Sequence, residues 1–143
     1  MLLISHRGNI NGPTSKENSP SYIDEAIELG YDVEIDVWYH QEQYWLGHDK
    51  PQYKVDLQFL LNRAENLWCH AKNLKALENM LNNKIHCFWQ HSDDYAVTSE
   101  GYIFTHSNIT KETPRSIIVS LSGDHPVKNP AGVCSDHVSK YKK

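Results

Sequence analysis

The stretch Val33-Glu34-Ile35-Asp36-Val37 is an apolar, strand-forming run that carries two carboxylates. Side chains along a β-strand alternate between its two faces, so both carboxylates point to one side and the three apolar residues to the other. Like charges on one strand face repel each other unless a cation lies between them, and hard divalent cations prefer carboxylate oxygens. The other interpretation is a solvated strand face opposite a buried apolar one. These residues alone leave both interpretations open.

Three further polar motifs lie close to this strand in the sequence. They read His6-Arg7-Gly8 after a strand-like run, Glu17-Asn18-Ser19 in a turn, and His48-Asp49 after a second short apolar run. Imidazole titrates near neutral pH and so suits acid–base catalysis, while the planar guanidinium of arginine matches phosphate oxygens. The motifs therefore favour the first interpretation and indicate a site for a cation and a phosphate.

In this order the motifs resemble those of the glycerophosphodiester phosphodiesterase family, within the phosphatidylinositol-phospholipase-C-like phosphodiesterases. That family opens with a strand ending His-Arg-Gly, followed by a Glu-Asn-Thr/Ser turn, a Glu-x-Asp strand and a hairpin ending His-Asp. Two weaker likenesses lie downstream. His70-Ala71-Lys72 stands where the family has a Glu-x-Lys strand, and residues 132–136 are similar to its closing Gly-Ile-x-Thr-Asp strand. The resemblance is specific over residues 2–49 and weaker beyond them.

The resemblance implies a metal-dependent phosphoric diester hydrolase in which His6 and His48 act as the general base and acid. Hydrolysis of a phosphodiester needs such a pair, because water must lose a proton and the leaving alkoxide must gain one. Arg7 and Lys72 are expected to bind the phosphate. Glu17 is carried over as a further site residue that orients Arg7 or a histidine. The family likeness also implies that a substrate hydroxyl attacks first and gives a cyclic phosphate.

The predicted metal ligands are Glu34, Asp36 and His70. Mg²⁺ or Ca²⁺ is the first expectation from the two carboxylates. At position 70 the resembling family has a glutamate that binds the metal, so this chain departs from the family pattern. A histidine removes one negative charge and favours a borderline cation such as Mn²⁺ or Zn²⁺.

The order of the apolar runs predicts an α/β fold, a compressed or incomplete TIM-type (β/α) barrel with helices mainly in its first half. The whole of residues 1–143 is expected to form one domain, although a full barrel of this type needs about 250 residues. Predicted strands cover residues 2–5, 31–39, 43–46, 67–72, 85–90, 102–105, 116–121 and 132–135. Predicted helices have N-caps at Ser21, Asp56 and Asn73, and the third turns Leu74, Leu77 and Leu81 to one face. Active sites of such barrels lie at the carboxyl ends of the strands, where His91 and His106 could join the predicted site.

Charge and composition limit the partners. A net charge of −4 gives no general attraction to nucleic acid, and no apolar run approaches the length of about 20 residues that spans a membrane. Three cysteines without paired spacing predict free thiols in a reducing compartment, and the N-terminal residues show no secretion signal. A cytoplasmic protein is therefore expected. An incomplete barrel exposes sheet edges, and a homodimer is one way to cover them.

The predicted substrate is a small-molecule phosphodiester, or one derived from a glycan or lipid. The chain is too short to contain the family's substrate-binding insertion. An open groove that binds a phosphodiester larger than a glycerophosphodiester is therefore a further alternative. The alternative function is a degenerate, non-catalytic phosphoester-binding domain. The short chain and the change from glutamate to His70 motivate this alternative.

Overall fold

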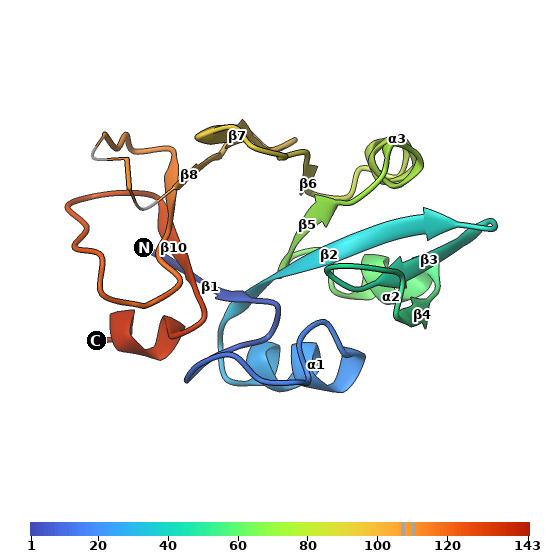
Figure 1. Cartoon of the computed structure of the whole chain (residues 1–143), viewed down its shortest axis with the longest axis horizontal. Coiled ribbons are helices and arrows are strands. Elements are labelled where there is room, and N and C mark those ends of the chain that lie inside the picture. The colour runs from blue at the N-terminus through green and yellow to red at the C-terminus, as the bar shows by residue number, and fades with distance from the viewer. Residues whose placement is uncertain (107, 110) are drawn as a thin grey trace.

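The computed structural model, which describes residues 1–106, 108–109 and 111–143, contains ten strands in one curled sheet (Figure 1). The strands are β1 (Leu2–His6), β2 (Asp32–His40), β3 (Gln43–Leu46), β4 (Tyr53–Val55), β5 (Leu67–Ala71), β6 (Cys87–Phe88), β7 (Tyr95–Val97), β8 (Ile103–His106), β9 (Ser116–Val119) and β10 (Gly132–Ser135). The helices are α1 (Pro20–Glu28), α2 (Leu57–Asn62), α3 (Leu74–Asn82) and the 3₁₀-helix η1 (Val138–Tyr141).

The sheet is mixed. Its longest path runs β4-β3-β2-β1-β10-β9-β8-β7, and β5 pairs with β2 and with β6. Strands β6, β5, β2, β1, β10, β9 and β8 are parallel to their neighbours in that order, whereas β3, β4 and β7 join by antiparallel pairing. An isolated antiparallel bridge joins Phe88 to Thr98. The parallel strands therefore bring their carboxyl ends to one edge of the curl.

The expected compressed or incomplete TIM-type (β/α) barrel is wrong. The described residues form a strand-rich half-barrel with only three α-helices, of nine, six and nine residues. Beyond α3, loops and η1 join the strands, and Figure 1 shows no α-helix over the β8–β10 side. The helices lie in the first half of the chain, as expected, and the error concerns the sheet. Antiparallel strands β3, β4 and β7 join the parallel strands, and the sheet forms a half-barrel.

Capping residues fix the starts of two helices as predicted. The side chain of Asp56 accepts a hydrogen bond from the Phe59 backbone N–H, and Asn73 accepts one from Ala76. The predicted cap at Ser21 is wrong, because α1 begins two residues earlier with Ser19 as N-cap and Pro20 in its first turn. Proline suits that position since it needs no amide donor there.

The buried face of α3 also differs from the prediction. Leu74 is 72% exposed and Leu81 is 50% exposed, while Ala76 and Met80 are fully buried. The sheet accepts a small and a flexible side chain at these two positions. Leu74 and Leu81 lie on the outer side of the helix, whereas Leu77 is half-buried and packs against the core, so the position of the sheet outweighs the hydrophobicity of the individual residues.

Two apolar clusters occupy the two faces of the sheet. The outer cluster joins Val33, Ile35 and Val37 of β2 to buried residues of α1, α2 and α3. The inner cluster contains residues of the strands themselves: Ile4, Trp68, Phe88, Ala96, Phe104, Ile117 and Cys134. Strand alternation therefore turns Glu34 and Asp36 away from the helices and toward the inside of the curl, as the sequence pattern predicts.

Some predicted strands differ in extent. The run 85–90 shortens to Cys87–Phe88, and the sequence pattern missed β4 and β7, each of three residues. All three cysteines are buried free thiols. Across the described residues, none of the helices has the length and apolar character needed to cross a membrane.

Candidate metal and phosphate site

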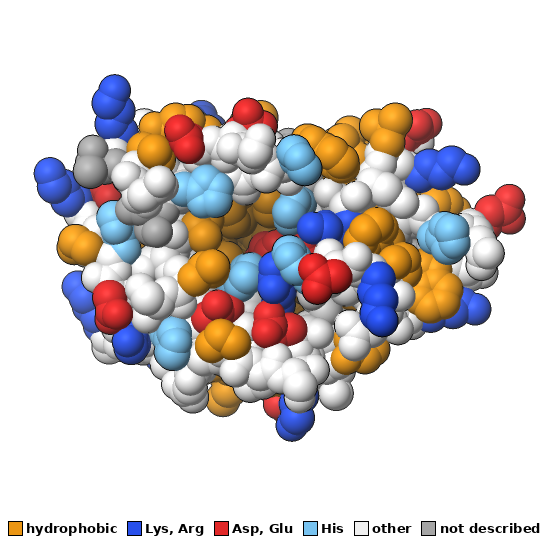
Figure 2. Space-filling view, in the orientation of Figure 1, with side chains coloured by type: hydrophobic (Ala, Val, Ile, Leu, Met, Phe, Trp, Pro, Cys, Tyr) orange, Lys and Arg blue, Asp and Glu red, His pale blue; other side chains and the backbone are white. Residues whose placement is uncertain are grey.

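Polar side chains of β1, β2 and β5 gather on the inner face of the sheet, at the carboxyl ends of β1 and β5 and in the middle of β2. Parallel register pairs His6 with Glu34 and Asp36 with His70, so three neighbouring strands bring these four residues together. In Figure 2 this face is hollowed near its centre, with histidine, basic and acidic side chains around the hollow. The site is therefore built on strands, which hold side chains more rigidly than loops do.

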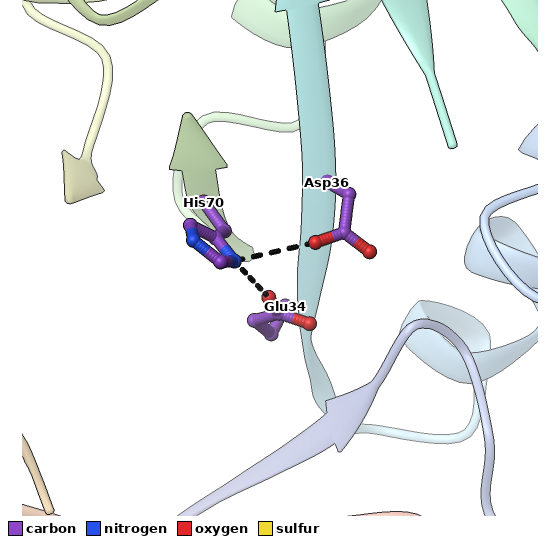
Figure 3. A group of neighbouring side chains, drawn as sticks. All are labelled: Glu34, Asp36 and His70. Carbon is purple, nitrogen blue, oxygen red and sulfur yellow. Dashed lines mark ion pairs between the residues drawn. The ribbon is translucent and has the colours of Figure 1, made fainter. Parts of the chain in front are cut away.

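Glu34, Asp36 and His70 form a compact cluster of possible metal ligands, and their ligand atoms lie within 4.8 Å of one another. His70 Nδ1 is 3.3 Å from Asp36 Oδ1 and 3.7 Å from Glu34 Oε2 (Figure 3). These are the three residues predicted as ligands from the sequence.

Burial makes the two carboxylates unusual. Asp36 is fully buried and Glu34 is 4% exposed, yet Asp36 Oδ1 and Glu34 Oε1 have no hydrogen-bond partner among the described residues. Burial and the charge of Asp36 raise the pKa of Glu34. Burial also acts to raise the pKa of Asp36, but His48, His70, Arg7 and Asn18 outweigh it and lower that pKa. The cluster thus combines one firmly ionised carboxylate with one whose charge is costly without a cation.

The other oxygen of Asp36 is fully occupied. Asn18 Nδ2 donates to Asp36 Oδ2 over 3.0 Å, and the Asn18 side-chain oxygen accepts from the Asp36 backbone N–H at the same distance. Arg7 Nε lies 3.1 Å from Oδ2 and His48 Nδ1 lies 3.7 Å from it. Asn18 has a φ of 67°, a left-handed conformation that asparagine tolerates better than most residues. These contacts fix the carboxylate plane and leave Oδ1 facing His70.

Arg7 links the parts of the site. Its backbone N–H donates to the Glu34 carbonyl, and its guanidinium contacts Asp36, Glu17 and His48. Arg7 Nη1 donates to Glu17 Oε1 over 3.2 Å. Glu17 therefore orients Arg7, the first of the two roles expected for it.

His6 has a carboxylate partner outside the predicted set. Its Nδ1 lies 2.7 Å from Asp136 Oδ1, which also accepts a hydrogen bond from Asn9 over 2.9 Å. His6 Nε2 lies 3.8 Å from Glu34 Oε1. Burial lowers the pKa of His6, but the hydrogen bond to Asp136 and the charge of Glu34 outweigh it, so that pKa is raised. Asp136 in turn has a lowered pKa, because the bond to His6 outweighs its burial.

A groove of about 240 Å³ runs beside this cluster, and Arg7, Glu17, Asn18 and His48 line part of it. The His48 side chain is 44% exposed and lies at the groove, just beyond β3. Its Nε2 is 3.6 Å from Asp49. A histidine in this position is open to a substrate from solvent.

Lys72 joins the site less closely than the other predicted residues. It follows β5 and is half-buried, and its backbone N–H donates to Val37. Within the described parts of the chain, no hydrogen bond or ion pair holds its ammonium group. His106 Nε2 lies 3.4 Å from the Gln90 side chain, and His91 is exposed. The structure brings neither histidine into contact with the carboxylates.

Sequence reasoning assigned no role in the site to Asp136, Asn9 or Asn18. Asp136 is 130 residues from His6 in sequence, but β10 lies beside β1 in parallel register. The usable signal was the position of Asp136 directly after a strand, in the Gly-Val-Cys-Ser-Asp run. Knowledge that β10 pairs with β1 would have placed Asp136 beside His6.

No known protein family, curated protein or solved structure matches this chain. The likeness to glycerophosphodiester phosphodiesterases rests on the sequence motifs.

Proposed function

We propose that this protein is a metal-dependent phosphodiesterase that hydrolyses a glycerophosphodiester or a related phosphodiester with two histidines. The observation that supports the proposal best is the convergence of His6, Arg7 and His48 on the Glu34–Asp36–His70 cluster from separate elements. A phosphodiester is an anion with a poor leaving group, and its hydrolysis needs positive charge and two proton transfers. This constellation offers both.

The residues present are suited to a divalent cation. Two unpartnered, buried carboxylate oxygens and a nearby imidazole nitrogen are the donor types that such ions bind. Glu34, Asp36 and His70 would hold the ion. When bound, it would withdraw electrons from the phosphoryl group and offset the charge that develops there.

The two histidines would exchange protons with the reacting atoms. Asp136 occupies His6 Nδ1, so Nε2 would take the proton from the attacking hydroxyl or water while the new oxygen–phosphorus bond forms. His48, on the open side of the site, would donate a proton to the leaving oxygen as its bond to phosphorus breaks. Arg7, held by Glu17, would bind the phosphate oxygens, and Lys72 would add a positive charge at the rim.

The test is hydrolysis of bis(p-nitrophenyl) phosphate and glycerophosphocholine by the chelator-stripped protein, with Mg²⁺, Ca²⁺, Mn²⁺ or Zn²⁺ added back singly. We expect metal-restored turnover that falls by at least about 100-fold in His6→Ala and in His48→Ala. His40→Ala is the matched control, because His40 is exposed at the far end of β2. Full activity of either site variant would refute the acid–base assignment.

A non-catalytic phosphoester-binding domain is the second candidate. The observation that favours it is His70 beside Glu34 and Asp36, because the resembling family has a metal-binding glutamate at this position. Calorimetric binding of glycerol phosphate without turnover under any of the four metals would select this candidate.

We extend the proposal to a cytoplasmic enzyme acting on a small-molecule, glycan-derived or lipid-derived phosphodiester. The three buried free cysteines support a reducing compartment. The edge strand β7 exposes Tyr95 and Val97, the latter by 69%, which supports the homodimer expected from the sequence. Light scattering on the purified protein measures its mass directly, and a monomer at micromolar concentration would refute the dimer.

A further inference from the structure

We propose that the Gln90 backbone carbonyl makes His70 a directed nitrogen ligand, and that this tunes the carboxylate cluster toward Mn²⁺ or Zn²⁺ and away from Mg²⁺ and Ca²⁺. The inference deepens the metal site on which the proposed function rests. Its evidence is geometric: one nitrogen of His70 has a partner in the protein, and the other faces two carboxylate oxygens.

The Gln90 carbonyl fixes the proton on His70. His70 Nε2 lies 3.0 Å from that carbonyl oxygen, which can only accept, so Nε2 carries a hydrogen and donates it. A backbone carbonyl is held by the chain and cannot turn away as a side chain can. The lone pair of the neutral ring then lies on Nδ1, the nitrogen that faces Asp36 Oδ1 and Glu34 Oε2 (Figure 3). Histidine ligands of metals show this arrangement, in which one ring nitrogen donates to a carbonyl or carboxylate and the other binds.

Phe88 holds the plane of the ring. Its side chain stacks on His70 with centroids 5.0 Å apart and an interplanar angle of 11°. Phe88 itself stacks on Phe104 in the inner apolar cluster, with centroids 4.4 Å apart. The imidazole is thus fixed at one edge by a hydrogen bond and over one face by packing, and its direction toward the carboxylates is preset.

The spacing of the donor atoms suits a divalent cation, and the nitrogen ligand rather than the spacing is what favours Mn²⁺ or Zn²⁺. A tetrahedral ion with bonds of about 2.0–2.1 Å separates its ligand atoms by about 3.3–3.4 Å. The observed separations from His70 Nδ1 are 3.3 Å to Asp36 and 3.7 Å to Glu34. Two buried carboxylate oxygens that face one imidazole nitrogen make a place for a positive partner, and a divalent cation would fill it.

The experiment is calorimetric titration of the chelator-stripped whole protein with each chloride of Mg²⁺, Ca²⁺, Mn²⁺ and Zn²⁺, for wild type and for His70→Glu. Most mixed-ligand sites bind Zn²⁺ more tightly than Mn²⁺, so a simple ranking does not decide the question. The deciding quantity is the ratio of the Mg²⁺ and Zn²⁺ dissociation constants. We expect that ratio to fall by about tenfold or more in His70→Glu, because the change replaces a nitrogen donor with a carboxylate, which Mg²⁺ prefers.

His91→Ala is the matched control and should leave the ratio unchanged, because His91 is exposed and does not contact the cluster. If His70→Glu fails to fold by circular dichroism, His70→Gln replaces it, with loss of Zn²⁺ affinity as the expected result. A second readout uses nitrogen-15 NMR of the Zn²⁺-loaded protein. We expect His70 Nε2 to keep its hydrogen and Nδ1 to show the shift of a metal-bound nitrogen.

Three results would overturn the inference: an unchanged ratio in the His70 variant, a metal bound through Nε2, or no binding of any ion to the wild type. Turnover measurements separate these failures from failure of the proposed function. Phosphodiester hydrolysis with Mg²⁺ and an unchanged ratio would leave the function standing and refute the ligand role. Zn²⁺ binding through His70 Nδ1 without hydrolysis would support the ligand role and refute the proposed function.

Discussion

Replacing Asn18 by alanine should destabilise the protein and loosen the metal site together. Asn18 is buried, and its side chain makes two hydrogen bonds to Asp36, one to the carboxylate and one to the backbone N–H. A bond to a charged group contributes about 1.5–3 kcal/mol, and an unsatisfied buried N–H costs about 1–3 kcal/mol. Alanine in the left-handed conformation at φ 67° adds about 1 kcal/mol. We expect a loss of about 3.5–7 kcal/mol in the free energy of unfolding.

Glycine at position 18 separates the two causes. Asn18→Gly removes the same hydrogen bonds but accepts a positive φ without strain. Its free energy of unfolding should therefore be about 1 kcal/mol larger than that of Asn18→Ala. Urea unfolding followed by fluorescence gives both values. Titration of the chelator-stripped variants with MnCl₂ measures the site itself, and we expect affinity to fall by about 10- to 100-fold because Asn18 orients a ligand from outside the coordination sphere.

Asn129→Ala is the control, because Asn129 is exposed and its recorded contact is through its backbone N–H. Its effect should stay within about 0.5 kcal/mol. An unfolding free energy for Asn18→Ala within the same limit would contradict the hydrogen-bond account. A large loss of stability with unchanged Mn²⁺ affinity would show that Asn18 braces the fold without positioning Asp36.

Three further changes test other parts of the structure. Burial lowers the pKa of His86 despite the nearby charge of Glu100, so the unfolded chain binds that proton more readily than the folded one. The free energy of unfolding therefore decreases as pH falls through about 6.5. His86→Gln should make the free energy of urea unfolding depend less on pH between pH 7 and 5, and the same pH dependence in both proteins would contradict this. Asp136→Asn should lower the pKa of His6 in an NMR titration and cost about 1.5–3 kcal/mol in urea unfolding, and an unmoved pKa would refute the pairing. Gly8→Ala should lower the free energy of unfolding by about 1–3 kcal/mol. Gly8 has a φ of 98°, and a Cβ there would lie 2.5 Å from the Tyr22 ring. An unchanged melting temperature would show that the ring moves freely.

The sequence predicted local features better than global ones. The N-caps Asp56 and Asn73 and the alternation along residues 33–37 depend on neighbours in the chain, and the structure confirms them. The buried face of α3 depends on which side the sheet lies, and the spacing of its leucines could not reveal that. The barrel prediction failed for a related reason. It assumed that the strands continue into a parallel barrel, whereas β3, β4 and β7 join by antiparallel pairing and the sheet forms a half-barrel.

The site depends on the order of the strands as well as on its motifs. Glu34 and Asp36 share a face through local alternation, but His70 reaches them only because β5 pairs with β2 in the register that sets Asp36 beside His70. His6 reaches Asp136 in the same way, one step beyond the pairing of Ser5 with Ser135. The parallel pairings of β10, β1, β2 and β5 therefore bring polar residues of these strands to the same site. Residue spacing within the Glu-x-Asp motif therefore predicted that the two carboxylates share a face, while pairings between distant strands brought His70 to them and supplied the partner of His6.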